Sequence, residues 1–232
     1  MHYMDQLLFA VLPYVATLTL LLVSIQRYLA QSFTFSSLST QLLENKRHFW
    51  TMVPFHYGIL FVFAGHIVAF LIPRSILLWN RAPLRLYFLE IVALIFGIVT
   101  VVGLIGLIVR RLTEPKVRSV TSVGDWILFG LLLVETVSGI GVAVYHPWGS
   151  SWFAASLSPY LWSLVKFNPD LNFVYAMPFL VKLHIVNAFL VVAAFPFTRL
   201  VHILVIPNPY IWRRPQVVRW YDGGVRSDGG DR

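Results

Sequence analysis

Residues 55–66, FHYGILFVFAGH, place two histidines, His56 and His66, inside a run that is otherwise apolar enough for lipid. Ionisable side chains are costly in a membrane span, so their presence there indicates a functional site. A second apolar stretch begins at His184 and ends at His202. The nitrogen of a neutral imidazole is a natural axial ligand for haem iron. The two stretches therefore predict two helices that hold two haems, each between two histidines.

The composition places the chain in a bilayer. Of its 232 residues, 58% are hydrophobic and 12% are charged, and the charged share of ordinary soluble domains is about twice as large. The chain has no cysteine, which excludes disulfides, iron–sulfur ligation by thiolates and covalent c-type haem within it. We therefore expect non-covalent haem b. Basic loops beside anionic lipid explain the net charge of +8, so we expect no binding to nucleic acid.

The apolar runs predict an all-α integral membrane protein with five transmembrane helices. About 20 apolar residues are needed to cross a hydrocarbon core of about 30 Å. The predicted spans are residues 7–25, 49–73, 91–109, 126–145 and 178–206. The first could be a cleaved signal, but no Lys or Arg precedes it and it is long for a signal core, so we expect a retained anchor. Residues 1–206 then form one dihaem domain, and residues 207–232 form a basic cytoplasmic tail that is partly disordered.

The segments between the spans carry surface signals. Residues 26–47 are polar and predict a surface loop, and residues 74–90 predict a short connection. An aromatic region contains a predicted interfacial helix at residues 152–166, because amphipathic rings are enriched at the membrane surface. Pro196 predicts a kink in the fifth span. Three glycines in the third span permit close approach of a neighbouring helix or a macrocycle, namely Gly97, Gly103 and Gly106.

Orientation follows from the basic residues. Most of the 18 Lys and Arg residues fall in the loops after the first and third spans and at the C-terminal end. The opposite side carries Arg74, Arg81, Arg85, Lys166 and Lys182. Because cytoplasmic loops are enriched in Lys and Arg, we expect the N-terminus outside and the C-terminus in the cytoplasm.

This topology pairs the histidines by depth. His56 and His202 lie near the cytoplasmic side, and His66 and His184 lie near the outer side. The spacings within the two helices do not match. His56 and His66 are separated by about 15 Å along a helix, whereas His184 and His202 are separated by about 27 Å if that helix is straight. We expect helix tilt, the kink and tilted haem planes to absorb the difference.

Each polar residue also has a simpler interpretation. A single intramembrane histidine can be structural, but four in two spans at matching depths favour ligation, while His2, His48 and His146 are expected at the surface. Arg199, Arg110 and Arg111 can bind haem propionates or serve as ordinary cytoplasmic anchors. Glu135, in the middle of the fourth span, must be neutral or paired.

Three segments carry a resemblance that covers nearly the whole chain: FHYGILFVFAGH, RRLTEPKVRSVTSVGD and LVKLHIVNAFLVVAAFPFTRLVH. They resemble the gamma subunit of membrane-bound respiratory nitrate reductase, a five-span dihaem cytochrome b. The resemblance implies that His56, His66, His184 and His202 are the axial ligands, paired as above. It also implies a quinol site at the outer haem and electron delivery to an iron–sulfur beta subunit and a molybdenum-containing alpha subunit in the cytoplasm.

One position departs from that family. The family's quinol site is associated with a lysine just before the third span, but NRAPLRLYFLE contains none. Arg85 is nearest, with Arg81 as the alternative, and an arginine does not readily give up a proton. We expect the quinol near Gly65, His66 and Arg85. Glu90 is either an acceptor of a quinol proton or a solvated carboxylate at a helix start.

These inferences predict a multi-pass subunit of the cell membrane that oxidises quinol on the outer side and passes electrons through two b haems to a cytoplasmic nitrate reductase. It contributes the quinol-oxidising half of a complex and does not reduce nitrate alone. Two alternatives stay open. The chain can be the dihaem subunit of another quinol-linked reductase, for example in sulfur metabolism. It can also be a haem-free transporter whose histidines relay protons, although this leaves their pairing by depth unexplained.

Overall fold

The computed structural model describes residues 2–30 and 48–204, which form helices and connecting turns. Five helices are long and apolar enough to cross a membrane, and they cover Tyr3–Ala30, Phe49–Leu71, Pro83–Thr113, Val123–Tyr145 and Phe179–Phe197. The predicted all-α architecture with five spans is therefore confirmed. The predicted tail and most of the predicted loop after the first span lie outside the described residues.

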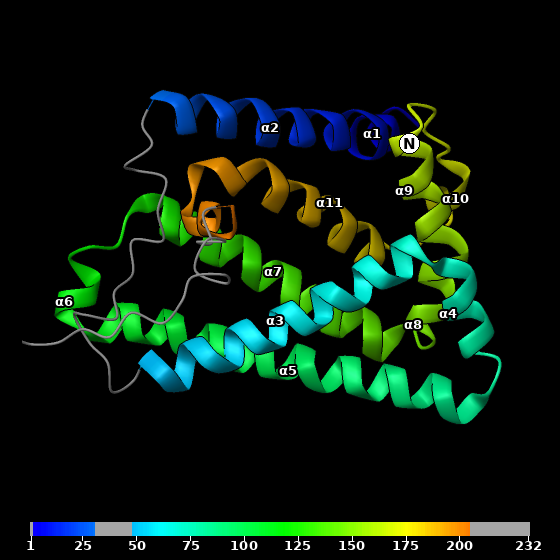
Figure 1. The fold of residues 1–232 in the computed structure, drawn as a ribbon, viewed down its shortest axis with the longest axis horizontal. Coiled ribbons are helices and arrows are strands. Elements are labelled where there is room, and N and C mark those ends of the chain that lie inside the picture. The colour runs from blue at the N-terminus through cyan, green and yellow to red at the C-terminus, as the bar shows by residue number, and fades with distance from the viewer. Residues whose placement is uncertain (1, 31–47, 205–232) are drawn as a thin grey trace, which may run out of the picture.

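The spans are formed by α1 (His2–Gln6), the π-helix η1 (Leu7–Val11) and α2 (Leu12–Ala30), then by α3 (His48–Leu71), α5 (Pro83–Thr113), α7 (Val123–Tyr145) and α11 (Phe179–Ala194). Figure 1 shows these long helices running along the long axis of the molecule. The short helices α4 (Pro73–Trp79), α8 (Gly149–Trp152), α9 (Ser158–Val165) and α10 (Asn172–Tyr175) gather at one end, and α6 (Pro115–Arg118) lies at the other. The spans thus form a bundle with a helical cap at one end.

Small residues bring α3 and α5 together. A Cβ atom on Gly103 would lie 2.5 Å from the backbone nitrogen of Phe55, and one on Gly58 would lie 2.9 Å from the backbone oxygen of Phe96. The backbones therefore approach too closely for a side chain at either position. Of the two uses expected for the glycines of the third span, close packing against a neighbouring helix is confirmed at Gly103, and it fixes α3, which carries His56 and His66, against α5.

The helical cap closes the bundle over a core of buried apolar side chains. The predicted helix at residues 152–166 is present in three pieces, α8, the π-helix η3 (Phe153–Leu157) and α9. Tyr160 in α9 is fully buried, and its hydroxyl donates a 2.7 Å hydrogen bond to the backbone oxygen of Phe9. Burial raises the pKa of Tyr160, so the phenol stays protonated as a donor. This bond ties the cap to the first span.

Three predicted boundaries differ in the structure. The surface loop predicted from residue 26 begins later, because α2 continues to Ala30. The connection predicted at residues 74–90 is mostly helical, because α4 begins with Pro73 and α5 begins with Pro83, both at favourable first-turn positions. The predicted fifth span, residues 178–206, does not continue as one α-helix. It ends at Ala194 and continues as the 3₁₀ helices η4 (Phe195–Phe197) and η5 (Arg199–Ile203). Pro196 lacks the backbone N–H that an α-helix requires, so the expected kink is a break.

Candidate functional site: two histidine pairs

The structure brings the four predicted histidines together in two pairs. The ring centroids of His66 on α3 and His184 on α11 lie 6.3 Å apart, with 47° between the ring planes. The centroids of His56 on α3 and His202 on η5 lie 6.2 Å apart, with 66° between the planes. These are the pairs expected from an antiparallel crossing of the second and fifth spans.

Hydrogen bonds orient three of these rings through their Nδ1 atoms. The Nδ1 atom of His56 lies 2.8 Å from the backbone oxygen of Met52, and that of His66 lies 2.8 Å from the backbone oxygen of Val62. His202 contacts the backbone oxygen of Arg199 in the same way. A carbonyl oxygen only accepts, so Nδ1 carries the hydrogen in each ring and the Nε2 lone pair is free for a ligand.

The ring separations fit a metal centre held between two imidazoles. A bond from metal to imidazole nitrogen is about 2 Å long and the ring centre lies about 1 Å further on, so two imidazoles on opposite sides of one metal have centroids about 6 Å apart. The observed separations are 6.3 Å and 6.2 Å. The donors present therefore suit an axially ligated haem iron at both pairs.

The break in the fifth span removes the mismatch in spacing. A straight helix would place His202 about 27 Å along the axis from His184, but α11 ends at Ala194. The backbone is extended at Thr198, with φ −119° and ψ −179°, and η5 begins at the next residue. His202 therefore approaches His56 from a redirected segment rather than from the end of a long rod.

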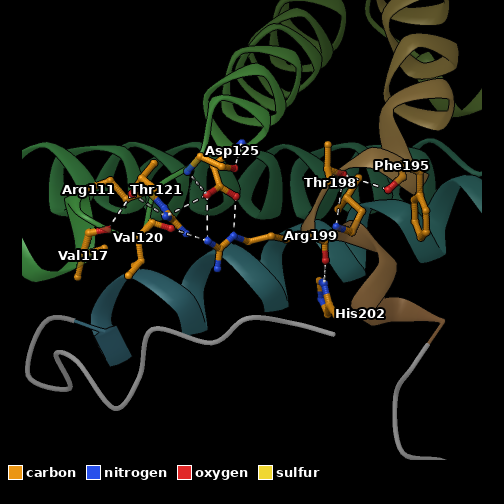
Figure 2. A network of polar contacts seen from close by, with 11 residues as sticks. Arg111, Val117, Val120, Thr121, Asp125, Phe195, Thr198, Arg199 and His202 are labelled. Carbon is orange, nitrogen blue, oxygen red and sulfur yellow. Dashed lines mark hydrogen bonds and ion pairs between the residues drawn. The ribbon is translucent and has the colours of Figure 1, made fainter. Parts of the chain in front are cut away.

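An ionic network holds that segment in place. The Arg199 side chain donates from Nε and Nη2 to the two carboxylate oxygens of Asp125, and Nη2 also donates to the backbone oxygen of Val120 at 3.0 Å. Arg111 lies 3.5 Å from the same carboxylate and donates to the Thr121 hydroxyl at 3.0 Å. Figure 2 shows these groups beside the turn that carries His202. The network joins α5, the start of α7 and η5.

Asp125 is the centre of this network, and no role was predicted for it from the sequence. Its side chain accepts a 2.9 Å hydrogen bond from the Ser122 backbone, and the Ser122 hydroxyl accepts one of 3.2 Å from the Asp125 backbone. A serine followed three residues later by an acidic residue is a recognisable signal for such a reciprocal cap at a helix start. This local signal does not reveal the ion pairs of Asp125 with Arg111 and Arg199, which lie elsewhere in the chain.

The arginines predicted at the haem propionates are mostly buried at this end. Arg110 is 3% exposed and Arg111 is 9% exposed. The guanidinium groups of Arg111 and Arg199 both engage Asp125, which gives them a structural role. Their expected contact with propionates, and that of Arg110, stays a prediction.

Comparisons with known proteins decide the family. The nitrate reductase gamma subunit family matches residues 5–221. The chain is 31% identical over 225 residues to the respiratory nitrate reductase 2 gamma chain of Escherichia coli K12, covering 94% of this chain and 98% of the relative. It is 30% identical over 217 residues to the nitrate reductase gamma chain of Bacillus subtilis 168, covering 92% and 97%.

This chain belongs to the nitrate reductase gamma subunit family. A weaker match, 27% identical over 175 residues, joins it to one component of the dihydromethanophenazine:CoB–CoM heterodisulfide reductase of Methanosarcina barkeri, covering 72% of this chain and 59% of the relative. With five apolar helices, this member of the gamma family is a multi-pass membrane protein.

The residues predicted for quinol lie at the capped end of this gamma-family chain. His66 is exposed within the described structure and its ring meets the ring of Phe153 edge-on, with centroids 5.2 Å apart. The space beside Gly65 is open, because no heavy atom lies within 4 Å of a Cβ built there. The Arg85 guanidinium lies 5.1 Å from the centroid of the Trp79 ring. Arg85 thus stacks on α4, and its role with quinol stays a prediction.

Glu90 differs from its expected place at a solvated helix start. It lies inside α5, is half-buried, and accepts a 2.8 Å hydrogen bond from the Ser150 backbone. The Asn80 amide group donates to the hydroxyls of Ser150 and Ser151 at 3.0 Å and 2.9 Å. This second polar group fastens α5 to the cap. Asn80 could not be singled out from the sequence, because a lone amide in a turn carries no pattern.

Proposed function

We propose that this chain is the quinol-oxidising, electron-transferring membrane subunit of a respiratory nitrate reductase, and that it holds two b haems. The observation that carries the proposal is the pairing of four intramembrane histidines at 6.2 Å and 6.3 Å between ring centroids. Membership of the nitrate reductase gamma subunit family supports the same role.

The residues of this chain perform the binding and the orientation. His66 and His184 would hold one haem, and His56 and His202 the other, through their Nε2 atoms, which the Nδ1 contacts leave free in His56, His66 and His202. When bound, the haems would supply one-electron redox centres across the bilayer.

Quinol is proposed to bind beside His66. Gly65 precedes His66 on α3 and has no heavy atom within 4 Å of a Cβ built on it, so a flat ring can lie beside this end of α3, next to the haem that His66 and His184 would hold. Arg85 can donate a hydrogen bond to a quinol oxygen but does not readily accept a proton, because the guanidinium stays charged. The quinol protons therefore need another acceptor, and Glu90 is the carboxylate that the described part of the chain offers in α5 near that end.

The proposed orientation makes the reaction electrogenic. With the N-terminus outside, protons leave quinol on the outer side and electrons exit at the His56–His202 pair on the cytoplasmic side. Other nitrate reductase subunits, an iron–sulfur beta subunit and a molybdenum-containing alpha subunit, would dock there, where Arg110, Arg111 and Arg199 lie. Charge movement of this kind across a membrane stores about 2.3 kcal/mol per elementary charge and 100 mV.

Single histidine variants test the haem assignment. We expect His66→Ala and His202→Ala each to remove one of two b-haem signals from the reduced-minus-oxidised spectrum of membranes. The control is His146→Ala, since His146 ends α7 outside both pairs, and this variant keeps both signals. Two unchanged haem signals in His66→Ala would contradict the proposal, and so would a colourless wild-type protein.

The similarity to one component of a heterodisulfide reductase supports a second candidate, in which this chain serves another quinol-linked reductase. Gentle purification of the complex, followed by metal analysis, distinguishes a nitrate reductase partner from another reductase. Copurified molybdenum and a nitrate-reducing subunit support the nitrate reductase assignment. A thiol-disulfide reductase as the copurified partner would replace it.

A further inference from the structure

We propose that Glu135, Ser138 and Asn187 form a positioning cluster that fixes the His184 ring and makes the His66–His184 pair chemically different from the His56–His202 pair. This inference rests on the proposed role of His184 as a haem ligand. The Nδ1 atom of His184 lies 3.1 Å from the Ser138 hydroxyl oxygen and 3.3 Å from Oε1 of Glu135. The Nδ1 atoms of His56, His66 and His202 contact backbone carbonyls of their own segments, whereas the partners of His184 lie on α7 and include two side chains.

The direction of the hydrogen bonds follows from the partners of Ser138. Its hydroxyl donates to the backbone oxygen of Glu135 at 3.1 Å, so its lone pairs are left to accept. The Ser138 hydroxyl therefore accepts from Nδ1 of His184, which carries the hydrogen. Because Nδ1 is the donor, the Oε1 atom of Glu135 that faces it is a second acceptor. The Nε2 lone pair of His184 is then free, as in the other three histidines.

Asn187 holds the Glu135 carboxylate in place. Its amide nitrogen donates to Oε2 of Glu135 at 2.8 Å and to the backbone oxygen of Leu131 at 2.9 Å. Asn187 is 4% exposed and lies one turn after His184 on α11. One carboxylate oxygen is thus occupied by Asn187, and the other faces His184.

The backbone of α7 fixes the ring from a further side. A Cβ on Gly139 would lie 3.0 Å from the Cε1 atom of His184. The ring therefore packs directly against the backbone of α7, and a side chain at position 139 would crowd it. The His184 ring is therefore restrained by contacts from α7 at Glu135, Ser138 and Gly139. None of these restraints comes from its own helix.

Two side-chain acceptors at one histidine have an electronic consequence. An acceptor on Nδ1–H makes Nε2 a stronger donor to a metal, which stabilises the oxidised form. Hydrogen bonding around the ligands is one of the ways in which a protein sets a haem potential. We therefore expect the cluster to lower the midpoint potential at the His66–His184 pair, with no effect at the His56–His202 pair.

The test uses membranes that contain the full chain in its complex, with redox titration and low-temperature EPR of the oxidised haems. Glu135→Leu removes the carboxylate acceptor, Ser138→Ala removes the hydroxyl, and Glu135→Gln keeps an acceptor oxygen. Thr136→Val is the matched control, because the Thr136 hydroxyl bonds to the backbone of its own helix at Leu132. We expect Glu135→Leu and Ser138→Ala to raise the midpoint of one haem and shift its low-spin signal. Glu135→Gln should return both toward wild type, and Thr136→Val should change neither.

The outcomes separate the two proposals. Wild-type potentials and signals in both Glu135→Leu and Ser138→Ala would overturn the positioning role, and so would equal shifts at both haems, which indicate general damage. If Glu135→Leu does not accumulate, Ser138→Ala decides by the same criteria. A His184→Ala variant that keeps two wild-type haem signals would instead overturn the proposed function.

Discussion

At the scale of single residues, Asp125 shows how one carboxylate organises a distant ligand. It is 3% exposed and engages Arg199 through both oxygens. The backbone oxygen of Arg199 in turn contacts His202. A buried charge that loses its partner is destabilising because its desolvation is no longer offset. Asp125 therefore acts on His202 through the segment that carries it.

A double-mutant cycle of Asp125→Asn and Arg199→Gln measures this pair. We expect each single variant to destabilise the protein and the double variant to cost less than their sum, with a coupling of roughly 0.5–3 kcal/mol. The measurement is unfolding of the purified protein in detergent, followed by Trp fluorescence.

Asp170→Asn is the control for this cycle, because Asp170 accepts a hydrogen bond from the Asn172 backbone in the loop before α10. Combined with Arg199→Gln, it should show additive effects. Additive costs for the Asp125 and Arg199 variants would show that the ion pair does not hold η5.

At the scale of elements, the contact between α3 and α5 depends on the absence of side chains. Gly103 faces the backbone of Phe55, the residue before His56. A methyl group there would push α3 away and move His56 relative to His202. The helix pair is therefore coupled to the geometry of the proposed ligand pair.

Gly103→Ala tests this coupling. Overpacking typically costs about 1–3 kcal/mol, and this exceeds the gain of about 1 kcal/mol from replacing glycine in a helix. We expect lower thermal stability and a disturbed low-spin signal at the His56–His202 pair. Gly130→Ala is the control, because no heavy atom lies within 4 Å of a Cβ built at Gly130. It should be neutral or slightly stabilising, and equal stability of the two variants would contradict the close contact.

A second element-scale prediction concerns the end of α11. Pro196 is buried, and its backbone oxygen accepts a 2.6 Å hydrogen bond from Arg27. Pro196→Ala restores the missing N–H and favours continuation of the α-helix past Ala194. We expect the haem signal assigned to His56 and His202 to weaken while the other persists. An unchanged spectrum would show that Thr198 and the Asp125 network redirect the chain without the proline.

At the scale of the whole molecule, the bundle has two unlike ends. One end carries the ionic network of Arg111, Asp125 and Arg199, and the other carries the cap of α4, α8, α9 and α10. The proposed direction of electron flow requires the first end to face the cytoplasm, as the distribution of Lys and Arg predicts.

Reporter fusions test this orientation. A fluorescent protein fused after Arg232 should fold and fluoresce, because we expect that end in the cytoplasm. An alkaline phosphatase inserted after Phe167, an exposed residue between α9 and α10, should be active, because we expect the cap outside. Inactive phosphatase together with a non-fluorescent C-terminal fusion would indicate the opposite orientation, and quinol oxidation would then be on the other side of the membrane.

Apolar runs in the sequence predicted the number of spans, small residues indicated where α5 can be approached closely, and the topology of the spans predicted the two histidine pairs. Lipid demands long apolar helices whose backbone groups bond internally, and antiparallel spans place residues of matching depth at the same level of the bundle. The tertiary structure alone decided that α11 stops at Ala194, that Asp125 engages Arg111 and Arg199, and that Glu135 faces His184 beside Asn187. These contacts join residues far apart in the chain, and no short-range periodicity encodes them, because they depend on how each helix is rotated and placed against its neighbours.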